Sequence, residues 1–303
     1  MTKNNIKGIQ RKIPSYTIKG LLESESGIQQ DEAVNLLVFE TRKLPKMLQN
    51  ENPFRQDFYA IGLVLEGTLH IGIDFNQYEV NPNTFFFGTP KQVITSKSDV
   101  KLGFGVLFKK DFLMRQVPPG WLRSLPIFHR FHSSPLLEID SLESTNILFY
   151  LQSMLFEYHA TTPYKYDKLR ALLMLLLVEI STFQKERVGT EDKKQDHHLD
   201  RFEALIDENY NETRSVKDYA EMMFMTPQSL NRTIKLRTGK TASDLISERV
   251  VLEIKRNLLY TDKSGDEIAA YLNFYDNSYF VKYFKKYAGM TPKEYRAVNH
   301  GKT

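Results

Sequence analysis

The stretch FYDNSYFVKYFKKYAGMTPKEYR, residues 274–296, combines aromatic residues, lysines and a Gly-x-Thr-Pro sequence within one short segment. About fifty residues upstream, MTPQSLNRTIKLRTGKTASD, residues 225–244, has a similar order of apolar residues, basic residues and a Gly-x-Thr sequence. The similarity of the two stretches predicts that one structural unit occurs twice in the chain.

The later copy predicts a short helix, a turn and a second helix. Residues 264–267 form a capping box, in which the serine caps a helix and the glutamate reaches back to the capping residue. A turn is expected at 273–275, and Gly289 is expected to end the second helix. Phe280 and Phe284 lie four residues apart and share one helix face, which we assign to the core.

The earlier copy follows the same plan, with its turn at 224–225. Leu230 and Ile234 stand fifty residues before the two phenylalanines of the later copy. Ahead of the turn Ala220 matches Ala269, forty-nine residues later, so one residue has been added at the second turn. A short helix, a tight turn and a second helix make up the helix-turn-helix plan, whose second helix enters the major groove of DNA.

The segment between the copies predicts one long helix. Residues 242–259 contain neither Gly nor Pro and carry two apolar stripes. At 1.5 Å per residue this helix is roughly 27 Å long. One turn of B-DNA is about 34 Å. We therefore expect the long helix to hold two recognition helices on one face of a duplex, each in a successive major groove.

The C-terminal stretch YLNFYDNSYFVKYFKKYAGMTPKEYR, residues 271–296, closely resembles the signature of the AraC/XylS family of bacterial transcription regulators. The matching residues are Phe280, Phe284, Lys285, Gly289, Thr291, Pro292, Tyr295 and Arg296. The resemblance begins near Leu199 and covers about a third of the chain. Phe224-Met225 stands where the family usually has a glycine and an apolar residue, and Ile234 stands where it often has an aromatic residue.

The resemblance implies a sequence-specific regulator that binds double-stranded DNA at promoters, with RNA polymerase as a partner if it is an activator. Family analogy and exclusion of the core face give these DNA-contacting residues: Gln228, Asn231, Arg232 and Lys235 on the first recognition helix, and Asn277, Ser278, Val281, Lys282 and Lys285 on the second. Arginine and lysine suit guanine, amides suit adenine, and an apolar side chain suits the thymine methyl group. We assign Lys235 and Lys285 to the phosphate backbone.

The N-terminal part predicts a β domain followed by helices, so the chain as a whole is expected to be α+β. Residues 55–108 show short alternating runs separated by turns, with a hairpin at Glu66-Gly67. The strand pattern resembles the family's cupin-like sensing barrel. We expect a sensing and dimerisation domain at 1–187, a polar linker at 188–198 and a double helix-turn-helix domain at 199–303.

A helix around 169–180 is apolar on more than one face. Leu169, Leu172, Leu173, Leu176 and Ile180 form one stripe, while Leu175 and Val178 fall outside it. Such a helix must be covered on both sides. It predicts either a homodimer interface or a helix buried within one subunit, and the sequence favours neither.

A sensing barrel implies a small-molecule effector, for which Tyr59, Phe85, Phe87 and Phe104 are the candidate lining residues of one interior. Packing in the core is the alternative role for these aromatic side chains. The barrel region contains only one histidine, His70, so no metal-ligand set can be assembled. We therefore disfavour a metal-dependent cupin enzyme and expect no enzyme activity and no cofactor.

Composition sets further limits. The 303 residues include no cysteine, which excludes disulfides and thiolate chemistry and is consistent with a reducing compartment. Residues 224–303 hold 14 Lys and Arg against 8 Asp and Glu, a balance of +6, whereas the whole chain carries +4. A basic C-terminal end suits nucleic-acid binding. No apolar run reaches the roughly 20 residues of a membrane span, so we expect a cytoplasmic protein without a membrane partner.

Overall fold

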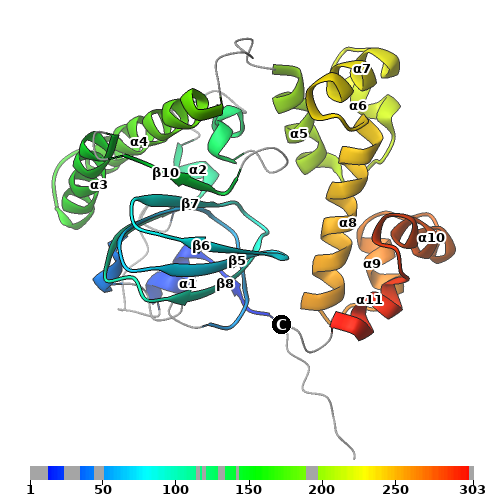
Figure 1. The fold of residues 1–303 in the computed structure, drawn as a ribbon, viewed down its shortest axis with the longest axis horizontal. Helices are drawn as coiled ribbons and strands as arrows, with labels where there is room; N and C mark the ends of the chain where they lie inside the picture. The colour runs from blue at the N-terminus through cyan, green and yellow to red at the C-terminus, as the bar shows by residue number, and fades with distance from the viewer. Residues whose placement is uncertain are drawn as a thin grey trace, which may run out of the picture. The chain divides into compact units, whose positions relative to one another are not determined.

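The computed structural model describes residues 13–23, 35–43, 51–113, 117, 121–128, 134–140, 143–188 and 197–299. These residues form two compact units, one within Pro14–Asp200 and the other mainly within Arg201–Thr303 (Figure 1). Most of the predicted linker at 188–198 lies outside the described residues. The combination of a β unit and an all-helical unit confirms the predicted α+β class.

The N-terminal unit contains two five-stranded sheets. In the first sheet the strand order is β1 (Ser15–Tyr16), β3 (Phe54–Gln56), β8 (Val93–Ser98), β5 (Leu69–Ile73) and β6 (Asn76–Val80). In the second it is β10 (Leu136–Glu138), β7 (Thr84–Gly88), β4 (Tyr59–Glu66), β9 (Leu102–Phe108) and β2 (Leu36–Glu40). All pairs are antiparallel except β1 with β3. The predicted antiparallel β domain is therefore confirmed.

The predicted hairpin at Glu66-Gly67 is wrong, because β4 and β5 belong to different sheets. Gly67 has φ +91°, and a Cβ atom there would lie 2.1 Å from the backbone oxygen of Asp99. The tight turn therefore forms a corner at which the chain leaves one sheet and enters the other. Alternation along the two strands is the same in a hairpin and in such a corner, so the sequence pattern does not distinguish them.

The space between the sheets is filled by apolar side chains. Across the second sheet, Phe39, Gly105, Gly62 and Phe86 stand side by side on four neighbouring strands. The ring of Phe86 occupies the place of a Cβ atom at Gly62, and the ring of Phe39 occupies that place at Gly105. The two glycines therefore make room for two phenylalanine rings, and a cavity of about 100 Å³ remains between the sheets.

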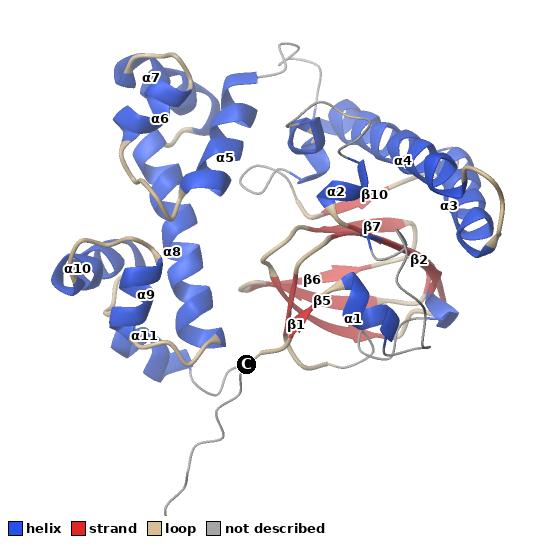
Figure 2. Cartoon of the chain, turned by 180° about the vertical axis from the view of Figure 1, so that it is seen from behind, coloured by secondary structure: helices blue, strands red, loops and turns tan. Residues whose placement is uncertain are grey.

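Two helices cover the other face of the second sheet, α3 (Glu143–His159) and α4 (Lys165–Val188) (Figure 2). Leu169, Leu173, Leu176 and Ile180 of α4 are fully buried in the core that the helices share with this sheet. The shorter helices of the unit are α1 (Ile18–Glu23), η2 (Thr41–Lys43), α2 (Lys110–Leu113), η4 (Trp121–Ser124) and η5 (Pro126–Phe128). The long apolar stripe of α4 thus packs within the subunit.

The C-terminal unit is built around one central helix, α8 (Ala242–Tyr260), which is about 28 Å long for its 19 residues. Towards one end of α8 lie α5 (His197–Asn209), α6 (Val216–Met222) and α7 (Pro227–Thr238). Towards the other end lie α9 (Gly265–Tyr271), α10 (Asn277–Ala288) and α11 (Pro292–Asn299) (Figure 1). The predicted long helix and the two helix-turn-helix units that it joins are confirmed.

Local signals determine where these helices begin and end. Ser264 and Glu267 form the predicted capping box at the start of α9. Thr226 caps α7 by accepting a hydrogen bond from Ser229 N–H. Gly239 and Gly289 follow α7 and α10 with φ of +71° and +78°, a conformation that favours glycine.

The central helix carries a cluster of buried charges. Arg249 Nε donates to Asp207 Oδ1 of α5 at 2.6 Å, and its guanidinium lies 3.8 Å from the ring centroid of Tyr210. Glu253 Oε2 accepts from both Arg249 Nη1 at 3.3 Å and Arg256 Nη1 at 3.2 Å. Arg249, Glu253 and Arg256 are at most 1% exposed. This cluster holds α5 against α8 and fixes the first unit on the rod.

Candidate nucleic-acid interface

The first recognition surface is the face of α7 that points away from the core. Leu230 and Ile234 are completely buried, which fixes the opposite face of the helix outward. The structure places Gln228, Arg232 and Lys235 on the exposed side. Their positions fit the sequence prediction, and their contact with DNA stays a prediction.

The second recognition surface is the equivalent face of α10. Phe280 and Phe284 are completely buried, as predicted. The side chains on the exposed side are Asn277, Ser278, Lys282 and Lys285. Two of these four side chains are lysines, so this surface is positively charged and suits phosphate oxygens as well as base edges.

Asn231 and Val281 do not belong to the open surface. The Oδ1 atom of Asn231 accepts a hydrogen bond from the backbone N–H of Ala242, the first residue of α8, at 3.0 Å. Val281 stands at the equivalent position fifty residues later and is half-buried. The assignment of Asn231 to base reading is therefore corrected to a structural role, because its acceptor atom already satisfies an N–H group at the start of a helix.

The sequence interpretation missed Leu236 and Lys286. Leu236 follows Arg232 by one turn of α7, and 75% of its side chain is exposed. Lys286 is the equivalent exposed residue of α10. A large apolar side chain on a polar face is the signal that reveals Leu236, because its helical spacing from Arg232 places it on the outward side. Leu236 is thus a better candidate than Val281 for contact with a thymine methyl group.

Both helix-turn-helix turns contain a residue in the left-handed region. Phe224 has φ +57° and Asn273 has φ +54°. Asparagine tolerates this conformation, whereas a phenylalanine there is strained. The side chain of Phe224 is 88% exposed and faces the guanidinium of Arg201 at 5.8 Å. The geometry explains why the family favours glycine at this place.

The predicted effector residues share one face, but it is the helix-covered face of the second sheet. Phe85, Phe87 and Phe104 are buried there in one core with α3 and α4, and Tyr59 packs against the same core. Phe86, between two of them in sequence, points instead into the space between the sheets. The prediction that the four residues line the barrel interior is therefore wrong, and their alternative role in core packing is confirmed.

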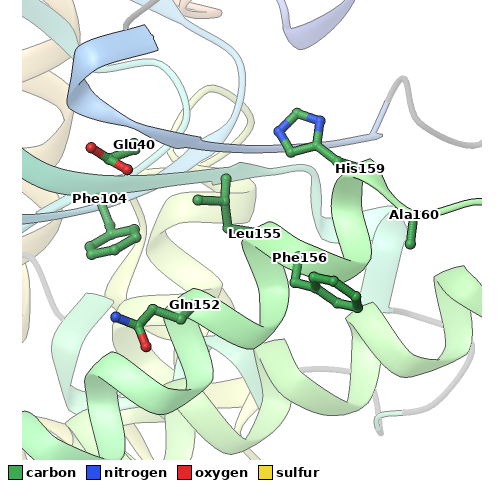
Figure 3. Close-up of a pocket in the computed structure, with 7 residues that line it drawn as sticks. All are labelled: Glu40, Phe104, Gln152, Leu155, Phe156, His159 and Ala160. Carbon is green, nitrogen blue, oxygen red and sulfur yellow. The ribbon is translucent and has the colours of Figure 1, made fainter.

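An open groove of about 560 Å³ lies beside this core, between α3 and the edge of the second sheet. Figure 3 shows Glu40 of β2 and Phe104 of β9 on one side, with Gln152 and Phe156 of α3 on the other. Its remaining lining residues are Leu155, His159 and Ala160. The groove combines apolar walls with a few polar side chains, which is typical of small-molecule sites.

Within the described ranges, we find no group of three or more His, Cys, Asp or Glu side chains placed to hold a metal ion. Nδ1 of His70 lies 4.0 Å from a carboxylate oxygen of Glu79, and both side chains are exposed. A search of the same ranges gives no helix with the length and apolar character needed to span a membrane.

Comparison with known proteins supports the helical unit. A helix-turn-helix domain family matches residues 219–297. YesN of Bacillus subtilis (strain 168), an uncharacterized transcriptional regulatory protein, is 40% identical over 101 residues, which are 32% of this chain and 27% of YesN. The transcriptional activator PerA of Escherichia coli O127:H6 is 30% identical over 105 residues, which are 33% of this chain and 36% of PerA.

Among solved structures, the C-terminal domain of the response regulator yesN from Fusobacterium nucleatum is 28% identical with a TM-score of 0.31. The match covers 32% of this chain and 96% of that domain. The chain spans only about a third of the curated relatives named above. Residues 219–297 belong to the AraC-type helix-turn-helix domains, as the C-terminal signature indicates.

Proposed function

We propose that this protein is a transcription regulator that recognises specific sequences in double-stranded DNA through α7 and α10. The observation that carries the proposal is the pairing of two exposed, basic helix faces on one rod. The rod α8 is about 28 Å long, which is near the spacing of successive major grooves, about 34 Å. A single chain thus presents two recognition helices to one side of a duplex.

Each helix combines groups for reading with groups for holding. Gln228 and Arg232 on α7 are suited to hydrogen bonds with adenine and guanine edges. Lys282 on α10 has the same role, since it is the equivalent of Arg232 fifty residues later. Lys235 and Lys285 follow at the next turn of each helix and neutralise phosphates, which adds affinity without sequence preference.

A selection of DNA duplexes from a random pool with the purified full chain tests this function. We expect a preferred sequence with two short determinants separated by about one helical turn, 10–10.5 base pairs. Binding to it should weaken steeply with salt, because phosphate contacts release counterions. Failure to enrich any sequence at low salt with folded protein would contradict the proposal. The matched control is the double variant Arg232→Ala and Lys282→Ala, which should lose the enrichment.

We also propose that the chain forms a homodimer through the outward side of α3 and α4. Leu175 and Val178 on α4 are 50% and 48% exposed, and Phe149 and Phe156 on α3 are more exposed still. Apolar side chains of this size rarely gather on one face of a monomer without a partner. This surface differs from the Leu172 and Leu176 pair that the sequence suggested, because Leu176 is completely buried.

A small-molecule effector acting on the N-terminal unit is the control that we propose. The groove beside α3 has about 560 Å³, whereas the cavity between the sheets has about 100 Å³. Drug-sized ligands occupy sites of roughly 300–1,000 Å³, so the volumes favour the groove. Metabolites that raise the melting temperature of the wild type should fail to do so with Gln152→Trp, which fills the groove. Thr145→Trp, on an exposed part of α3 outside the groove, is the control.

The remaining parts of the proposal follow from the regulator function. A DNA-binding regulator acts in the cytoplasm, and RNA polymerase is its partner if it activates transcription. The alternative of a metal-dependent cupin enzyme stays disfavoured, because His70 is the only histidine of the strand region and is exposed.

A further inference from the structure

Arg214 joins the two helix-turn-helix units at a point away from the central rod. It lies in the loop between α5 and α6, which belongs to the first unit. Its Nη1 atom donates to the backbone oxygen of Leu272 at 2.7 Å, and its Nη2 atom donates to the backbone oxygen of Asn273 at 2.6 Å. Both acceptors belong to the turn of the second unit, between α9 and α10.

Aromatic side chains of the second unit surround the same guanidinium. It lies 3.9 Å from the ring centroid of Phe274, which corresponds to a cation–π contact. The rings of Tyr279 and Tyr283 lie 5.9 Å and 5.3 Å from that of Phe274 and complete the aromatic cluster. The contact is therefore planar as well as charged, a geometry that lysine does not reproduce.

The loop that carries Arg214 is itself held firmly. Thr213 Oγ1 donates to Asp218 Oδ2 at 2.5 Å, and Ser215 caps α6 by accepting from Asp218 N–H. A second link crosses between the units where Asn273 Nδ2 donates to the backbone oxygen of Glu212 at 3.4 Å. Movement of the second turn therefore requires movement of the start of α6.

The first turn has a similar arginine, with one difference. Arg201 donates to the backbone oxygen of Met222 at 3.1 Å and lies over the ring of Phe224. Because Arg201 belongs to α5, this contact stays within the first unit. In the second turn the corresponding contact is supplied from outside the unit. Only the second recognition helix thus depends on its neighbour for the position of its turn.

We infer that Arg214 is a positioning residue that fixes the orientation of α10 relative to α7 and so sets the spacing of the two DNA half-sites. The rod α8 fixes the distance between the units, and Arg214 prevents the second unit from rocking on the rod. It acts at Asn273, whose left-handed conformation directs the chain into α10. This inference rests on the proposed DNA-binding function.

The test uses the full chain and its preferred duplex, with one base pair inserted or deleted between the two half-sites. One base pair rotates a half-site by about 34° and shifts it by about 3.4 Å. We expect the wild type to bind these altered duplexes about tenfold more weakly. We expect Arg214→Ala to bind the original duplex more weakly and to lose less than about threefold on the altered ones, as fluorescence anisotropy would show.

Arg201→Ala is the matched control, since it removes a turn contact without uncoupling the units. It should weaken binding to all duplexes and keep the wild-type spacing penalty. If Arg214→Ala does not fold, Arg214→Lys is measured by the same criterion, because it keeps the charge and loses the double hydrogen bond. A folded Arg214 variant with the wild-type spacing penalty overturns the inference alone. Absence of any wild-type DNA binding overturns the proposed function and this inference together.

Discussion

The side-chain oxygen of Asn231 accepts a hydrogen bond from the backbone N–H of Ala242, with 3.0 Å between the two atoms. The bond ties the middle of the first recognition helix to the first turn of the rod. We predict that Asn231→Ala lowers the free energy of unfolding by about 1 kcal/mol, the typical effect of losing a helix-capping acceptor. Chemical denaturation measures this change. DNA selection should show the same base preference as for the wild type, and a relaxed preference at one base pair would restore Asn231 to the reading residues.

Arg232 is exposed near the centre of the outward face of α7, so its substitution should affect reading without affecting the fold. Arg232→Ala is expected to cost about 1–3 kcal/mol of binding free energy and to relax the preference at one base pair. Lys285→Ala is the companion variant, because we place Lys285 at the phosphate backbone. It should weaken binding to all sequences equally and reduce the salt slope by about one. The two assignments are reversed if only Lys285→Ala changes the base preference.

Leu175 and Leu176 are neighbours on α4 with opposite environments, since one is half exposed and the other fully buried. Leu175→Glu together with Val178→Glu should convert a dimer into folded monomers, because the charges would face an apolar partner surface. Leu176→Glu should instead unfold the N-terminal unit, because it buries a charge without a partner. Light scattering and thermal melts distinguish these results. A monomeric wild type at micromolar concentration would refute the proposed interface.

The left-handed backbone at Phe224 offers a way to stabilise the protein. Phe224→Asn should raise the free energy of unfolding by about 1 kcal/mol, because asparagine tolerates φ near +57° and loses little exposed contact. Asn273, at the equivalent position of the second unit, already uses this solution. Calorimetry of the variant measures the gain. An unchanged or lower melting temperature would mean that the contact with Arg201 outweighs the backbone strain.

The C-terminal unit could be predicted closely because its signals are local. Ser264, Thr226, Gly239 and Gly289 each act within one turn of chain, through a cap or a left-handed conformation that their own side chains determine. The periodic placement of Phe280 and Phe284 likewise indicates a buried face without reference to the rest of the fold. Local chemistry therefore sufficed to locate α7, α8, α9 and α10.

The errors arose where the partner is remote in sequence. Alternation along β7 shows that Phe85 and Phe87 face the side opposite Phe86, but only the arrival of α3 and α4 decides which side that is. The acceptor role of Asn231 depends on the approach of α8, eleven residues later. The role of Arg214 depends on carbonyls 58 and 59 residues away, which no spacing in the sequence announces.

The buried charges of α8 restrict how this region can change over evolutionary time. Loss of Glu253 alone leaves two buried guanidinium groups without their shared carboxylate, and loss of either arginine leaves an uncompensated acid. Single replacements that break such a group are strongly destabilising, whereas joint replacement by apolar residues is often tolerated. The recognition helices, by contrast, expose Gln228, Arg232, Ser278 and Lys282 on surfaces that can vary freely. New target sequences can therefore be acquired one residue at a time, while the rod that spaces them can change only several residues at once.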